Sequence, residues 1–103
     1  MPRPERCRRI CCHPDSTFFK PRGIPLSDLD VVVLRLDEYE AVRLADCEGL
    51  AQSAAAKSMS ISQPTFNRIV GRARKKIADA IVNGKALRID TKKSPGYQGS
   101  EKK

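Results

Sequence analysis

A three-residue break, Ser60-Ile61-Ser62, separates two helix-forming stretches and constrains the fold more than any other feature. Residues 50–59 before it are small and have high helix propensity. Ser62 is a good helix N-cap, and Pro64 is tolerated in a first turn. After it, apolar residues recur at helical spacing up to Asn83-Gly84, namely Phe66, Ile69, Val70, Ala73, Ile77, Ala80 and Ile81. The pattern predicts a short helix, a turn, and a helix over residues 62–83, about 20 residues or about 30 Å long.

The residues before this pair predict a third helix and a short β-ribbon. Asp37, with Glu40 three residues later, is typical of a capping box, and about nine helical residues follow it before Gly49. Residues 29–36 are rich in β-branched side chains, and residues 86–90 alternate between apolar and polar, so we expect the two to pair. The predicted fold is mainly α: a three-helix domain with a short two-stranded ribbon.

A chain of 103 residues has room for one domain, which we place at residues 28–90. Residues 1–27 contain five prolines and predict an extended arm, which Phe18, Phe19 and Ile24 would attach to the core. Residues 91–103 are polar without apolar periodicity and predict a disordered tail. We find neither a membrane-spanning run nor the apolar stretch of a signal peptide, so a cytoplasmic protein is expected.

The net charge of +8 is unevenly distributed. Residues 1–27 carry six Lys/Arg against two acids, residues 28–56 two against seven, and residues 57–103 twelve against three. Two basic flanks around an acidic middle suit a protein whose flanks face a polyanion, because each cation on a phosphate releases counterions. The alternative is a solvated charged surface.

The helix–turn–helix pattern over residues 50–77 indicates how such a polyanion would be read. Small Ala56 permits the second helix to cross the third, and Ile61 fills the turn. The outer face of the third helix then begins with polar side chains that match base edges: Arg binds guanine, whereas Asn and Gln bind adenine. The candidate base-reading residues are Gln63, Asn67 and Arg68.

Other polar side chains of the third helix are candidates for phosphate contacts, which position a protein without reading sequence. They are Ser62, Thr65, Arg72, Arg74, Lys75 and Lys76. Ser60 departs from the common pattern, since this turn position usually holds Gly, and Ser must adopt a less favourable backbone there. The alternative interpretation is a three-helix bundle with a basic, solvated face.

Residues 1–90 resemble an uncharacterised prokaryotic family of predicted DNA-binding proteins, domain of unknown function 134. The resemblance is carried by Met1-Pro2-Arg3-Pro4, Arg8-Arg9, Phe19-Lys20-Pro21, Gly23-Ile24-Pro25, Asp37-Glu38, Glu40-Ala41, Arg43-Leu44-Ala45-Asp46, Gly49-Leu50, Ser62, Pro64-Thr65-Phe66, Arg68-Ile69, Ala73-Arg74-Lys75-Lys76, Ala78-Asp79-Ala80 and Gly84-Lys85-Ala86-Leu87. The family's helix-turn-helix is similar to the C-terminal domain of sigma factors. The resemblance therefore implies transcription control, with RNA polymerase as a further partner.

Cysteines near the N-terminus raise a metal or redox alternative. Cys7, Cys11, Cys12 and His13 supply ligands suited to zinc or an iron–sulfur cluster, and Cys47 could replace one of them. Adjacent Cys11 and Cys12 point in different directions, however, which favours ordinary thiols. A regulator that responds to metal or redox state stays open beside simple DNA binding.

The nearby arginines of the arm, Arg3, Arg6, Arg8 and Arg9, could enter the minor groove, or they could belong to a solvated tail.

A homodimer is expected, because one reading helix contacts few base pairs; Ile77, Ala80 and Ile81 are its candidate surface. An RNA-binding or ribosome-associated protein is the alternative, which the lack of exposed stacking aromatics disfavours. With one histidine, and without a nucleophile–base motif or a phosphate-binding glycine loop, the chain is not expected to be an enzyme.

Overall fold

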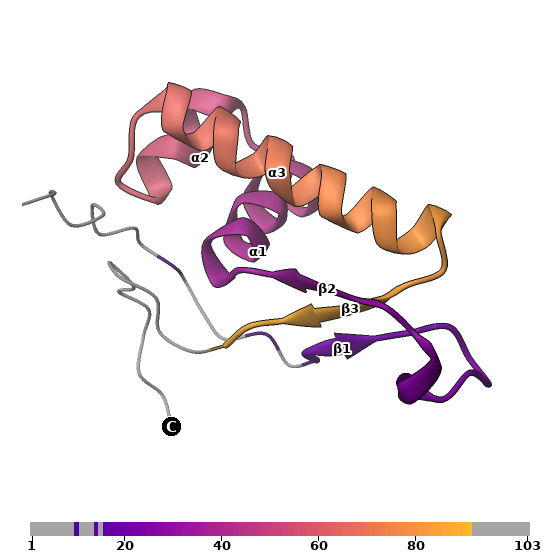
Figure 1. Cartoon of the computed structure of the whole chain (residues 1–103). Coiled ribbons are helices and arrows are strands. Elements are labelled where there is room, and N and C mark those ends of the chain that lie inside the picture. The colour runs from indigo at the N-terminus through magenta and orange to yellow at the C-terminus, as the bar shows by residue number, and fades with distance from the viewer. Residues whose placement is uncertain (1–9, 11–13, 15, 92–103) are drawn as a thin grey trace, which may run out of the picture.

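The computed structural model describes residues 10, 14 and 16–91, which form three α-helices and a small three-stranded mixed sheet (Figure 1). The strands are β1 (Phe18–Phe19), β2 (Val31–Leu34) and β3 (Ala86–Ile89). The helices are α1 (Leu36–Val42), α2 (Gln52–Ser58) and α3 (Gln63–Val82). A 3-10 turn (Leu26–Asp28) precedes β2, and a π-helical turn (Arg43–Cys47) continues α1.

The sheet has the order β1-β3-β2, and the helices pack on one of its faces (Figure 1). β2 and β3 pair in parallel, with Leu34 opposite Ile89, and all three helices connect them. The predicted pairing of these two strands is confirmed. The prediction of a two-stranded ribbon is wrong, because the antiparallel strand β1 adds to the other edge of β3.

The arm is held by this strand and by Ile10, rather than by the predicted aromatic anchors. Ile10 is 3% exposed and lies in the core beside the sheet, whereas Phe18, Phe19 and Ile24 are all at least 40% exposed. The expectation that the chain lacks exposed aromatic side chains is therefore wrong at Phe18 and Phe19. A two-residue strand presents few side chains, so backbone hydrogen bonds to β3 do most of the attachment. The predicted disordered tail, apart from Thr91, lies outside the described residues.

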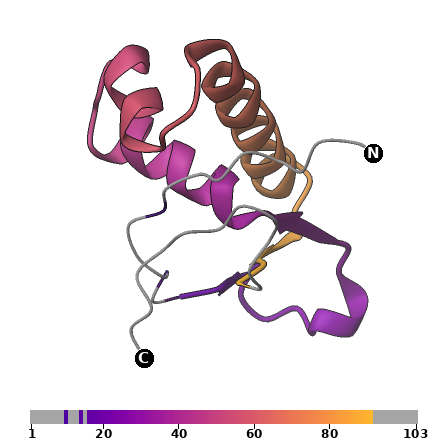
Figure 2. The ribbon, with the colours of Figure 1, turned by 90° about the vertical axis from the view of Figure 1, so that its left-hand side faces the viewer.

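Two apolar clusters fix α3 along its length. Phe66, Ile69 and Val70 near its N-terminus pack with α1 and α2, including buried Ala55, Ala56 and Met59. Further along, Ala73 and Ile77 pack against the sheet. Figure 2 shows α1 and α3 together above the sheet. The long helix α3 contributes residues to both clusters.

The start of α1 differs from the predicted capping box. The N-cap is Arg35, whose backbone N–H donates to Glu38 Oε1 at 2.8 Å. Asp37 instead lies inside the first turn, and Glu40 accepts two hydrogen bonds from the Arg43 guanidinium, at 2.8 and 2.9 Å. Because the Glu38 carboxylate bonds the Arg35 N–H, the helix starts two residues earlier than the sequence pattern indicates.

Glu38 joins this turn to α3. Its carboxylate is fully buried, and besides the Arg35 N–H it accepts from Lys76 Nζ at 2.7 Å and from Arg72 Nε at 3.3 Å. A buried carboxylate is tolerated only when it is paired and hydrogen-bonded. The three donors therefore hold α3 in one position against the β2–α1 junction.

We expect Glu38→Gln to lower the free energy of unfolding by about 3 kcal/mol, because it removes the charge that two cations and a backbone amide share. Urea unfolding followed by circular dichroism measures the loss. The matched control is Glu48→Gln, because the Glu48 carboxylate is 53% exposed and bonds Arg43 at 3.3 Å. Its effect should stay below about 1 kcal/mol. Equal effects of the two substitutions would contradict a special role for Glu38.

The C-terminal end of α3 supplies a pH-dependent contribution. Hydrogen bonds from Asn83 Nδ2 (2.6 Å) and then Lys85 Nζ (3.0 Å) hold the pKa of Asp79 below its ordinary value of 3.8. Because the folded state has the lower pKa, this contribution is complete above the ordinary value and is lost as pH falls through the folded value. The Tm of Asp79→Asn should lie below that of the unchanged protein at neutral pH, and the difference should close in acid. A difference that persists in strong acid would exclude the carboxylate as its cause.

Candidate nucleic-acid interface

The turn between α2 and α3 spans residues 59–62 and has the strained backbone that the sequence predicts. Ser60 has a φ of 58°. This value lies in the left-handed region that glycine adopts most easily. The Ile61 N–H donates to the Ala56 carbonyl at 3.1 Å, and its side chain packs against the cluster shared by α1, α2 and α3. The turn is therefore closed by local hydrogen bonds and by the partly buried Ile61 side chain, as predicted.

The first turn of α3 is capped as predicted. Ser62 Oγ accepts from the Thr65 backbone N–H at 3.2 Å and donates to Thr65 Oγ1 at 2.9 Å. Pro64 occupies the first turn, where no helical partner for its nitrogen is needed. Both predicted phosphate-binding hydroxyls are thus engaged with each other, which fixes their positions at the start of the helix.

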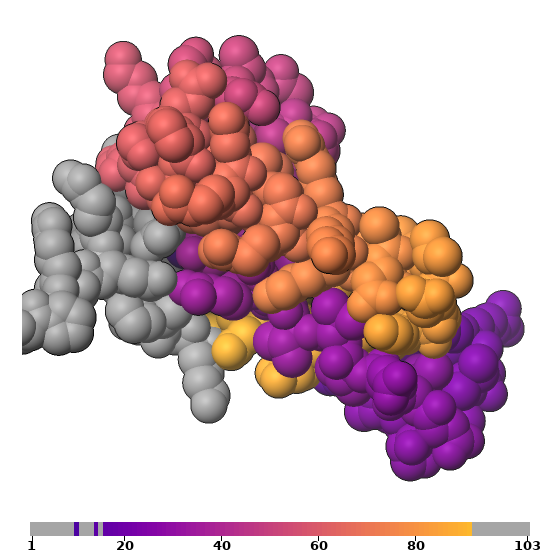
Figure 3. All heavy atoms as spheres, turned by 45° about the horizontal axis from the view of Figure 1, so that its top comes forward, coloured from indigo at the N-terminus to yellow at the C-terminus, as the bar shows by residue number. Residues whose placement is uncertain are grey.

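The three candidate base readers share the exposed side of the N-terminal half of α3. Gln63, Asn67 and Arg68 are all exposed, whereas Phe66 and Ile69 on the opposite side are buried. Gln63 Nε2 lies 3.4 Å from Gln52 Oε1, so the first residues of α2 and α3 meet at the surface. The side chains of Asn67 and Arg68 make no hydrogen bond or ion pair to any residue that the structure describes. Figure 3 shows α2 and this part of α3 forming a continuous outer surface.

Three of the four predicted phosphate-binding cations on α3 are paired within the protein. Arg72 and Lys76 bind Glu38, and Arg74 makes two hydrogen bonds to Asp46, at 2.9 and 3.0 Å. The hydrogen bond to Asp46 is also the main cause that raises the pKa of Arg74. The acids of residues 28–56 therefore neutralise part of the basic helix, which a count along the chain does not reveal.

Lys75 differs from these three cations. It is exposed and has no ion pair with the described residues. Exposed Lys57 at the end of α2 is likewise without one, and sequence reasoning had not selected it. Its position in the last turn before the break was the available signal. Within the described part of the chain, the unpaired cations of α2 and α3 are thus Lys57, Arg68 and Lys75.

The residues predicted for metal binding and for the minor groove lie mostly outside the described part of the chain. This holds for Cys7, Cys11, Cys12 and His13, and for Arg3, Arg6, Arg8 and Arg9. Cys47 is exposed at the end of the π-helical turn and lines a groove together with Pro14. Among the residues that are described, no group of three or more His, Cys, Asp or Glu side chains could hold a metal ion.

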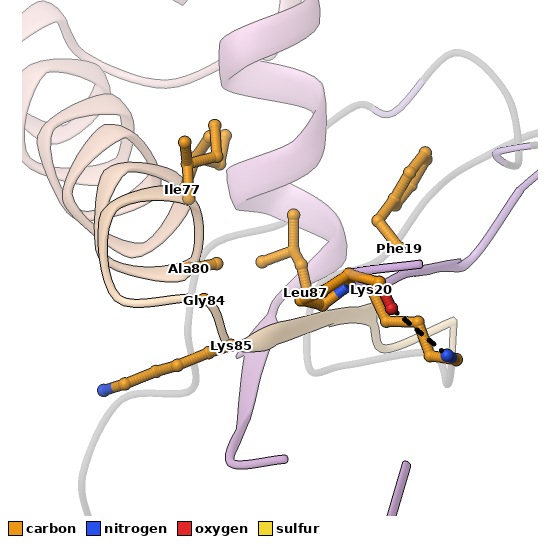
Figure 4. Close-up of a pocket in the computed structure, with 9 residues that line it drawn as sticks. Phe19, Lys20, Ile77, Ala80, Gly84, Lys85 and Leu87 are labelled. Atoms are coloured by element: carbon orange, nitrogen blue, oxygen red, sulfur yellow. Dashed lines mark hydrogen bonds between the residues drawn. The ribbon is translucent and has the colours of Figure 1, made fainter. Parts of the chain in front are cut away.

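An apolar groove of about 450 Å³ lies between the C-terminal end of α3 and the strands β1 and β3 (Figure 4). It brings together the predicted dimer residues Ile77, Ala80 and Ile81 with Phe19 and Leu87. Ile81 is 75% exposed. The groove-facing side of this end of α3 is therefore apolar, whereas the exposed side of its N-terminal half is polar.

Comparison with known proteins places the chain. No solved structure matches it. Among the described residues, no helix is long and apolar enough to cross a membrane. A UPF0251 protein of Thermoanaerobacter pseudethanolicus is 53% identical over 90 residues, which cover 87% of this chain and 76% of that protein. A UPF0251 protein of Pelotomaculum thermopropionicum is 55% identical over 89 residues, covering 86% and 67%. The model of the family described as "Protein of unknown function DUF134" matches residues 1–94, and the chain belongs to that family.

Proposed function

We propose that this protein binds duplex DNA sequence-specifically, with α2 and α3 acting as a helix-turn-helix and the N-terminal half of α3 entering the major groove. The observation that carries the proposal is the pair Asn67 and Arg68, exposed and unengaged on a helix whose other side is fixed in the core. A rigid helix with free amide and guanidinium groups at its N-terminal end meets the requirements of direct base readout.

The chemistry assigns a different role to each group of side chains. Arg68 donates two hydrogen bonds to guanine O6 and N7, while the amides of Asn67 and Gln63 match adenine N6 and N7. Contact between Gln63 and Gln52 supports this role, because it limits the rotamers of the reading amide. Lys75 and Lys57 contact phosphates on either side of the groove.

Paired cations add a weaker contribution. Arg72 and Arg74 remain 51% exposed while bound to Glu38 and Asp46, so each presents donors outward without leaving its partner. Their charges are partly cancelled by those partners. Phosphate affinity therefore depends mainly on the unpaired lysines, Lys57 and Lys75.

The protein would act as a homodimer that regulates transcription. Ile77, Ala80 and Ile81 form one side of the apolar groove, and a second copy seated there by a twofold axis would bury them. Paired reading helices multiply affinity and specificity. Likeness to the C-terminal domain of sigma factors, and contact with RNA polymerase, belong to this same proposal.

Arg68→Ala should weaken binding to the preferred duplex by about 1–3 kcal/mol and relax the sequence preference at one base pair. The measurement is selection from a random duplex library with the unchanged protein, Arg68→Ala and Asn67→Ala in parallel. Each variant should lose preference at its own position.

Lys75→Ala and Arg22→Ala are the controls for this experiment. Lys75→Ala should weaken all duplexes equally and reduce the salt slope by about 0.9. Arg22, exposed in the loop after β1, lies far along the chain from the reading face, and its loss should change neither quantity. Tighter binding to RNA than to duplex DNA, or enrichment of no motif, would overturn the proposal.

Ile81→Lys should convert the dimer to a monomer, because it places a charge in the apolar groove, and sedimentation equilibrium measures the change. Val82→Lys is the matched control: Val82 is 78% exposed but lines a different surface, beside Arg72 and Lys75. Loss of the dimer in both variants, or in neither, would exclude this groove as the interface.

A further inference from the structure

Gly71 lies in the middle of α3, where a glycine is unfavourable. Apart from proline, glycine is the residue that most destabilises a helix interior. Helical glycines often allow a neighbouring element to pack closely, but a Cβ added to Gly71 would meet no described atom within 4 Å other than the adjacent backbone of its own helix. The residue is exposed, so packing within the described fold does not explain it.

The neighbours of Gly71 on the helix surface indicate why a glycine occupies this position. Residues three and four apart lie on one side of a helix, so Asn67 and Arg68 precede it by one turn and Lys75 follows it by one turn. Arg68 and Lys75 are two of the unpaired cations described above. The exposed helix backbone at Gly71 thus lies between two cations that make no salt bridge with the described residues, although Lys75 also interacts electrostatically with Asp79.

We propose that Gly71 is the point at which the sugar–phosphate backbone of duplex DNA approaches the backbone of α3. This inference rests on the proposed function and adds a contact to it. A residue without a side chain permits a close approach of a ligand to the helix backbone, and Lys75 one turn further along favours an anionic ligand there.

The dimensions of helix and groove make such a contact useful. A helix with its side chains is about 10–12 Å across, and the major groove is about 12 Å wide. Little clearance remains, so a side chain facing the groove wall keeps the helix away from the base edges. The missing side chain at position 71 lets Asn67 and Arg68 reach deeper.

Gly71→Ala and Gly71→Leu test the inference, with Ala78→Leu as the matched control. Ala78 is exposed as well. It follows Gly71 by two helical turns on the same side of α3, roughly 10 Å further along the axis. Affinity is measured by fluorescence anisotropy with a random-sequence duplex at low salt, because a backbone contact does not depend on sequence. Tm is measured for each variant, and Arg68→Ala is included.

Gly71→Leu should bind the duplex about tenfold more weakly, a loss of about 1.4 kcal/mol. Gly71→Ala should lose less affinity for the duplex than Gly71→Leu does. Its Tm should rise by about 4 °C, because alanine stabilises the helix. Ala78→Leu should bind like the unchanged protein. Weaker binding by a more stable protein cannot come from damage to the fold.

Two failures are distinguishable. If the unchanged protein binds duplex DNA and Arg68→Ala weakens it, but Gly71→Leu binds normally, the inference about Gly71 is overturned and the proposed function stands. An equal loss in Ala78→Leu would also overturn it, because the effect would then not depend on position 71. If the unchanged protein does not bind duplex DNA, the proposed function itself falls.

Discussion

The buried carboxylate of Glu38 is the interaction on which the arrangement of the molecule depends. It accepts hydrogen bonds from the N-cap amide of α1 and from two cations of α3. These cations, Arg72 and Lys76, follow Glu38 in the chain by 34 and 38 residues. Apolar contacts alone would permit α3 to slide or rotate over aliphatic side chains, since the hydrophobic effect has no direction. Glu38 keeps all three of its donors in only one position of α3 relative to α1. This position determines which residues of α3 face outward.

The same ion pairs determine where positive charge is available. Residues 57–103 contain twelve basic side chains, but Glu38 and Asp46 bind three of those on α3. The middle of the helix is thereby committed to the fold. Unpaired charge is left at Arg68, in the N-terminal half of the helix, and at Lys75, just past its middle, so the candidate interface extends from the first turn of α3 to Lys75. Structural and binding tasks are thus divided along one element.

Local signals in the sequence predicted the helices well. Ser62, Pro64 and the apolar periodicity up to Ile81 place α3 correctly, because a cap, a first-turn proline and a buried stripe each act within a few residues. The sequence also indicated the strained Ser60 and the pairing of β2 with β3. The capped start of α3, the strained turn before it and the exposed base readers make up most of the candidate site.

What the sequence could not predict depends on distant contacts or on very short elements. A capping pair that begins with Arg35 does not resemble the usual Ser, Thr, Asp or Asn cap, so Asp37 was the natural choice. The partners of Glu38 are separated from it by whole elements. Strand β1 has only two residues, too few for an alternating pattern, and exists because β3 offers it an open edge.

The length of α3 also constrains the proposed dimer. Asn67 and Ile81 are fourteen residues apart, about 21 Å along the axis. Two such arms joined at Ile81, with about 10 Å between helix axes, place the reading residues no more than about 50 Å apart. Half-sites one DNA turn apart, at about 34–36 Å, are within this reach when the helices meet at an angle, whereas two turns are not. A single helix would therefore set the site spacing while its N-terminal half selects the sequence.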